Sequence, residues 1–149
     1  MSLSKRIMDS IINNDEDMIY YHIMMAELLD KTRIIYELIQ SDKFIIIENI
    51  ITKMHIEYPG LQFNIIFYSI FITSLCFEKS TDIYNIIKNN NINIDSQVLS
   101  NFIYSTFVLF EILKFEQKYK YKFNLQNTHT YEPFMMSIGC LFNSNIIFI

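Results

Sequence analysis

Apolar residues recur at helical spacing along the first half of the chain. Leu3, Ile7 and Ile11 fall on one face of a helix, and a similar recurrence runs through 34–39. Apolar positions three and four residues apart are typical of an amphipathic helix, whereas a half-buried strand alternates with period two. A polar turn at 13–15 follows the first stripe, and Asp42 is the predicted cap of a later helix. The pattern therefore predicts helices at 3–12, 18–29, 34–39 and 43–54.

An uncharged stretch follows the strongest turn signal in the sequence, Pro59-Gly60. It covers residues 63–77, which carry no charged side chain. A membrane-spanning helix needs about 20 apolar residues, so this stretch is too short to be one. It predicts a helix that is buried on most of its surface.

The remaining residues predict further helices separated by polar turns. The chain has two glycines and two prolines, so we expect Asn, Asp and Ser to build its turns. Residues 80–82 are a predicted helix start, and 89–91 are the predicted end of that helix. Ser96 begins a helix that reaches Phe110 or continues to about Glu116. Pro133 is expected in the first turn of a last helix, before an apolar stub at 146–149.

Composition limits the class of protein. The chain has 149 residues, of which 51% are hydrophobic, and a formal net charge of -4. This size suits one domain with ample material for a core, and disorder would need lower hydrophobicity and higher net charge. We expect one all-helical domain over 1–149, with N-terminal helices in 1–58 and further helix pairs in 59–149. Because the chain is acidic, we expect no nucleic-acid partner, and we expect no membrane span.

The two cysteines bear on the cellular compartment. Cys76 and Cys140 are far apart in the sequence and have apolar neighbours, which favours buried free thiols in a reducing environment. The first residues lack the apolar run of about 7–15 positions that a secretion signal needs. We therefore expect a cytoplasmic protein. Its richness in Ile and Asn is typical of AT-rich coding sequences, such as those of some protists and large DNA viruses.

No residue pattern indicates catalysis or metal binding. His22, His55 and His129 have no second His, Cys or carboxylate at a metal-ligand spacing. The acidic residues 15–17 lack the oxygen spacing of a calcium loop and are typical of a helix N-terminus. The glycines, at 60 and 139, form neither a phosphate loop nor a nucleophile elbow. We expect no enzyme activity, no cofactor and no metal.

Residues 114–123 form a basic and aromatic segment. Lysines at 114, 118, 120 and 122 are interleaved with Tyr119, Tyr121 and Phe123. Such interleaving can bind single-stranded nucleic acid through phosphate charge and base stacking. Glu111 and Glu116 dilute the positive charge, so a solvated helix end or turn is the preferred interpretation.

Two segments resemble ankyrin repeats. The segment 82–95 ends in Asn-Ile-Asn-Ile-Asp and resembles the second helix and turn of such a repeat, with Asn91 at the family's turn glycine. The segment 124–138 is similar to the next turn and first helix, with Glu-Pro-Phe-Met in place of Thr-Pro-Leu-His. Over 63–149 the resemblance implies a short solenoid of stacked antiparallel helix pairs.

The resemblance implies a protein-interaction module without enzyme activity. Repeat arrays bind partner proteins with their loops and inner helices. The expected contact residues lie in loops: Tyr58, Gln62, Gln97, Thr128, His129, Thr130 and Tyr131. We also expect that the apolar C-terminal end is covered by further repeats, by a partner or by self-association.

Two other families share features of the chain. An uncharged helix at 63–77 surrounded by amphipathic helices resembles a closed bundle of the viral apoptosis-regulator type. That alternative implies a groove that holds an amphipathic helix of a host protein. A pentatricopeptide array is also compatible with the segments 91–95 and 130–131, although its repeat length fits less well.

Overall fold

The structure is a computed structural model that describes residues 3–58, 60 and 64–123. All eight regular elements in these residues are α-helices, which confirms the predicted all-α class. The chain divides into two compact units, Met1–Ile92 and Asn93–Ile149, each described by itself below. The expected single domain stays a prediction.

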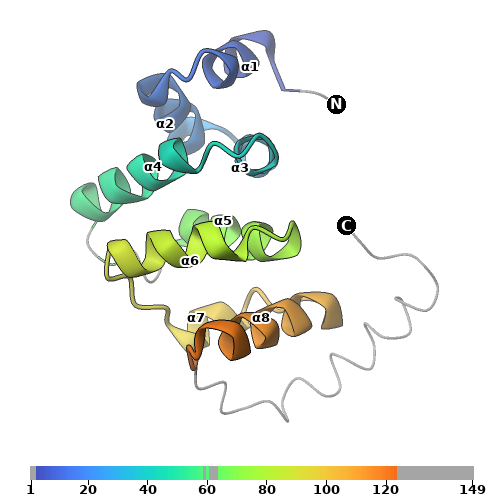
Figure 1. The fold of residues 1–149 in the computed structure, drawn as a ribbon. Coiled ribbons are helices and arrows are strands. Elements are labelled where there is room, and N and C mark those ends of the chain that lie inside the picture. Colours follow the sequence, from blue (N-terminus) through green and yellow to red (C-terminus); the bar gives the residue numbers. More distant parts are fainter. Residues whose placement is uncertain (1–2, 59, 61–63, 124–149) are drawn as a thin grey trace, which may run out of the picture. The chain divides into compact units, whose positions relative to one another are not determined.

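The first unit consists of three helix pairs (Figure 1). The helices are α1 (Lys5–Ile12), α2 (Glu16–Met25), α3 (Leu28–Gln40), α4 (Phe44–Glu57), α5 (Ile65–Cys76) and α6 (Ser80–Asn89). Both helices of a pair pack together, and a short turn, here called a tip, joins them. Helix α3 also packs against α1 and α5, and α4 against α2 and α6. First helices therefore contact first helices, and second helices contact second helices.

The tips close around left-handed residues that are not glycine. Asn14, Asp42 and Glu78 have φ angles of 55°, 55° and 61°. The following residue donates its N–H to a carbonyl five positions back, as Lys43 does to Leu38 at 2.9 Å. This Schellman-type closure satisfies carbonyl groups that a helix end leaves open. Asn14 and Asp42 agree with the expected turn chemistry, whereas a glutamate at such an angle was not expected.

Lysine side chains link neighbouring tips. Lys43 Nζ donates to the backbone oxygen of Ile11 and, at 2.7 Å, to Oδ1 of Asn14. Lys79 Nζ donates to Oδ1 of Asp42 at 2.5 Å. In both cases the lysine that follows one left-handed residue binds at the preceding tip. We call this set of contacts the tip ladder, and it holds the three tips next to one another.

Helix α5 is buried around most of its circumference. Its buried residues are Phe67, Tyr68, Ile70, Phe71, Ile72, Ser74 and Leu75. The hydroxyl of Ser74, the polar member, donates to the carbonyl oxygen of Ile70 at 2.7 Å, so burial leaves it satisfied. The predicted buried helix is confirmed for 65–76, while Phe63 lies outside the described residues.

A polar contact joins α4 to the end of α6. Asn90 donates from Nδ2 to Glu48 Oε2 at 3.0 Å, and it accepts from the Thr52 hydroxyl at 3.1 Å. Asn90 also caps its own helix by donating to the Ile86 carbonyl. The predicted end of this helix at 89–91 is confirmed, and Asn91 adopts a left-handed angle with φ 50°.

The second unit contains α7 (Ser96–Ser100) and α8 (Thr106–Tyr119) in its described part. The prediction of one helix from Ser96 to Phe110 or beyond was therefore wrong. Ser105 stops a continuous helix because its backbone is extended and its hydroxyl accepts from the Val108 N–H at 3.1 Å, which begins α8. Lys120 ends α8 with a left-handed angle.

Three helix starts in the first unit differ from the prediction. The apolar stretch 18–29 is split, because Ala26 and Glu27 take extended angles between α2 and α3. Asp42 is the left-handed tip residue and Lys43 is the N-cap, so Asp42 does not cap α4. Residues 80–82 are the first turn of α6, whose N-cap is Lys79. In each case the helix starts without a side-chain cap, which leaves no local signal in the sequence.

Candidate functional site

The residues predicted to contact a partner are only partly described. Tyr58 is the exposed C-cap of α4, and Gln97 is exposed on α7. Gln62, Thr128, His129, Thr130 and Tyr131 lie outside the described residues, as does Cys140. Tyr58 and Gln97 belong to different units, so the predicted set stays a prediction.

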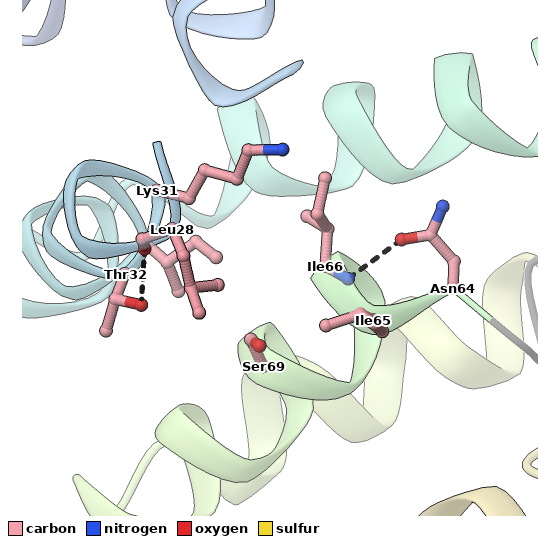
Figure 2. A pocket seen from close by; sticks show the side chains of 8 residues that line it. Leu28, Lys31, Thr32, Asn64, Ile65, Ile66 and Ser69 are labelled. Carbon is pink, nitrogen blue, oxygen red and sulfur yellow. Dashed lines mark hydrogen bonds between the residues drawn. The ribbon is translucent and has the colours of Figure 1, made fainter. Parts of the chain in front are cut away.

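A groove runs between the first two turns of α3 and the beginning of α5. Its cavity has a volume of about 390 Å³. The apolar lining consists of Leu28, Ile35, Ile65 and Ile66, and the polar lining of Lys31, Thr32, Asn64 and Ser69. We call this cavity the α3–α5 groove. Figure 2 shows the side chains of the two helices facing each other across it.

The apolar residues of the groove form a floor and two rims. Ile35 is buried at 3% exposure and belongs to the floor. Leu28 and Ile65 are 72% and 61% exposed and form the rims on α3 and α5. Met25 and Leu29, near the start of α3, are also exposed. Large apolar side chains exposed together are typical of a surface that another molecule covers.

Most polar groups in the groove are used within their own helix. Asn64 is the N-cap of α5, and its Oδ1 accepts from the N–H groups of Ile66 at 2.8 Å and Phe67 at 3.3 Å. The Thr32 hydroxyl donates to the Leu28 carbonyl at 2.9 Å. Lys31 is the charged residue among those that line the groove. Lys31 is half-buried, and its side chain extends from α3 toward the Ile66 side chain in Figure 2.

A second polar cluster joins α2 to α4 around Tyr20. The Tyr20 hydroxyl donates to Glu57 Oε2 at 2.6 Å, and Lys53 Nζ lies 4.4 Å from the centre of the Tyr20 ring. Burial, followed by the hydrogen bond to Glu57 and its negative charge, raises the pKa of Tyr20 above its usual range. The adjacent cavity, of about 40 Å³, is too small for a substrate. The hydrogen bond and the ring contact of this cluster connect α2 to α4.

Histidine and cysteine residues do not assemble a site in the described part of the chain. His55 is exposed, whereas His22 is half-buried with an enclosed Nε2 atom that has no hydrogen-bond partner there. Cys76 is half-buried, so the expectation of a buried thiol was wrong for this residue. It lies at the last position of α5, where one side of the helix faces outward.

The basic and aromatic segment folds onto itself. Rings of Phe115 and Phe123 stack with centroids 5.8 Å apart, and both residues are buried. The Phe123 N–H donates to Glu116 Oε2 at 2.9 Å, which fixes the segment against the end of α8. Lys118 lies over the neighbouring Tyr119 ring at 5.2 Å. Phe123 is therefore not presented for stacking with bases, whereas Tyr119 and Tyr121 are half-buried. Helix α8 ends at Tyr119, inside this segment.

Sequence reasoning did not identify the α3–α5 groove. The stretch 18–29 was interpreted as one helix, so Leu28 was not recognised as the start of another. Asn64 offered a signal, because a capping residue before an uncharged helix marks the start of α5. The spacing of Leu28, Lys31, Thr32 and Ile35 also places them on one helix face. No sequence pattern indicated that this face would meet the start of α5.

The described residues offer neither a metal-ligand cluster nor a membrane-spanning helix. These contain no group of three or more His, Cys, Asp or Glu residues that could hold a metal ion. None of the helices in the same residues is long and apolar enough to cross a membrane. Comparison with protein-family models, with curated proteins and with solved structures finds no match.

Proposed function

We propose that the chain is a protein-interaction module built from stacked helix pairs that resemble ankyrin repeats. The observation that carries this proposal is the α3–α5 groove, whose rims expose Leu28 and Ile65 beside a buried apolar floor. Apolar side chains in this arrangement gain free energy when a partner removes them from water. The proposal includes no cofactor and no chemical step.

The packing of the first unit supports the stacked version of this proposal. In a repeat array each pair contacts its neighbours in the same way along the stack. Helix α3 lies against α1 and α5, and α4 lies against α2 and α6, which is the expected order of contacts. The tip ladder adds a repeated contact. Lys43 at the second tip binds Asn14 at the first, and Lys79 at the third tip binds Asp42 at the second.

A closed helical bundle of the apoptosis-regulator type is the second candidate. The observation in its favour is α5, an uncharged helix buried around most of its circumference. A bundle of this type would surround α5 with amphipathic helices and hold a partner helix in one groove. Both candidates are interaction proteins, and they differ in whether the helix pairs follow one another in a line.

A selection experiment tests the interaction function. Random peptides displayed on phage would be selected against the immobilised full chain, with an uncoated surface as the blank. We expect enriched peptides that lose binding to Leu28→Ser and keep binding to Ile12→Ser. Ile12 is a matched control because it is 64% exposed and lies at the first tip, away from the groove lining. Failure to enrich any peptide above the blank would count against the proposal.

A further inference from the structure

We infer that the α3–α5 groove binds a short amphipathic helix of a partner protein, with an acidic residue of that helix placed next to Lys31. This inference rests on the proposed interaction function and adds the shape and charge of the partner. It follows from the length of the groove, from the kinds of side chain that line it and from its charge.

The length of the groove matches two helical turns. Leu28, Lys31, Thr32 and Ile35 follow one another at i, i+3, i+4 and i+7 on one face of α3. Seven residues at 1.5 Å per residue give a groove about 10 Å long. A helix that docks through apolar residues at i, i+3 or i+4 and i+7 covers the same length.

The lining of the groove excludes the other common modes of peptide binding. Strand addition needs an exposed sheet edge, and both walls of the groove are helices. Proline-rich peptides need an aromatic-lined groove, and phosphorylated peptides need an arginine cluster. The groove is lined by aliphatic side chains, hydroxyl groups, one amide and one lysine. Recognition by side chains alone is the mode of a helix in a groove.

The charge of the groove is opposite to the charge of the chain as a whole. The full sequence has a formal net charge of -4, whereas the charged residue that lines the groove is the cation Lys31. An acidic residue on the partner helix gains a charge-assisted contact if it lies beside Lys31. The same residue is repelled by the acidic chain elsewhere, so Lys31 fixes the register of the helix.

Two labelled peptides test the inference directly. Each is a hydrocarbon-stapled 12-residue helix with Leu at three positions spaced i, i+3 and i+7. They differ at one flanking position, which is Glu in one and Lys in the other. Fluorescence anisotropy with the full chain gives their affinities. We expect the Glu peptide to bind about 3- to 5-fold more tightly at low salt, the size typical of an exposed ion pair, and the preference to shrink in 0.5 M salt.

Variants of the chain identify the surface that binds. Lys31→Glu should reverse the preference in favour of the Lys peptide, and Leu28→Ser should weaken both peptides. Lys88→Glu makes the same charge change at an exposed position of α6 and should leave the preference unchanged. Equal affinity of the two peptides, no binding of either, or insensitivity to Lys31→Glu would overturn the inference. Suppose that the stapled peptides fail but phage selection yields peptides that bind outside the α3–α5 groove. The interaction function then stands, and only the inference about the helix fails. If phage selection yields no peptide, the interaction function fails as well.

Discussion

At the scale of the residue, Tyr20 shows how one polar group holds two helices. Its ring is buried between α2 and α4, while its hydroxyl reaches Glu57 and Lys53 lies against its face. A buried hydroxyl without an acceptor destabilises a fold, so Glu57 provides the contact that makes this burial tolerable. The cluster ties α2 to the far end of α4.

Tyr20→Phe should lower the free energy of unfolding by about 1–2 kcal/mol, because it removes a hydrogen bond to a charged acceptor and keeps the ring. Urea denaturation followed by circular dichroism measures the loss. Tyr21→Phe is the matched control, since Tyr21 is exposed on the same helix and should change stability by less than about 0.5 kcal/mol. Equal effects of the two substitutions would contradict this assignment.

The raised pKa of Tyr20 also predicts a loss of stability in alkali. An unfolded tyrosine ionises near pH 10, whereas folded Tyr20 keeps its proton to higher pH. Above about pH 10 the unfolded chain therefore binds fewer protons at this site, and the free energy of unfolding falls as pH rises. Below about pH 10 the protonated Tyr20 makes its full contribution to the free energy of unfolding. Denaturant titrations between pH 9 and 11 should show a steeper fall for the wild-type chain than for Tyr20→Phe, and parallel curves would exclude the effect.

Glu78 carries the clearest backbone strain at a tip. A left-handed angle costs a residue with a Cβ atom roughly 1–2 kcal/mol, and glycine avoids this cost but loses more backbone entropy on folding. Glu78→Gly should therefore raise the free energy of unfolding by about 0.5–1 kcal/mol. Asn91→Gly should give a smaller gain, because asparagine tolerates this angle. Thermal unfolding of the Glu78→Gly and Asn91→Gly variants compares their gains in stability. If Glu78→Gly destabilised the chain, the assignment of strain to Glu78 would be wrong.

At the scale of the element, tips and helix ends decide how the pairs fit together. The tip ladder uses the lysine that follows a left-handed residue, so the geometry of one tip places the donor for the preceding tip. The hydrogen bond to Asp42 raises the pKa of Lys79, so this donor stays charged to a higher pH than a lysine without such a partner. The ladder therefore favours one register of neighbouring pairs over others.

Lys43→Met should destabilise the first unit by about 1–2 kcal/mol, because it removes two acceptor contacts and keeps most of the apolar stem. The loss should appear in the free energy of unfolding from urea titration. Lys88→Met changes an exposed lysine of α6 and should have little effect. A loss for Lys43→Met no larger than that of the control would mean that the ladder does not stabilise the stack.

Helix identity was easier to predict than helix ends. The stripe at 34–39 and the uncharged stretch at 63–77 predicted α3 and α5, because periodicity and burial are properties of many residues together. The break at Ala26 and Glu27 was missed, because α3 starts without a side-chain cap. The α3–α5 groove could not be predicted for a related reason. Its walls, 28–35 and 64–69, are far apart in the sequence, and their meeting depends on packing between pairs.

At the scale of the whole first unit, we propose that the helix pairs follow one another in a line. The contacts of α3 and α4 with both neighbouring pairs and the tip ladder agree with this order. The order also creates the proposed site, because the α3–α5 groove exists where the first helices of two successive pairs meet.

Distances between equivalent positions test this linear order most directly. Asp17, Ile45 and Thr81 are exposed, and each lies three residues after the left-handed residue of its tip. Spin labels would be attached in pairs, after Cys76 and Cys140 are replaced by alanine. Packed helices lie about 8–10 Å apart. In a linear stack the 17–81 separation should therefore exceed the 17–45 and 45–81 separations by about one such step. Three equal separations measured by electron paramagnetic resonance would contradict a stack and favour a closed bundle.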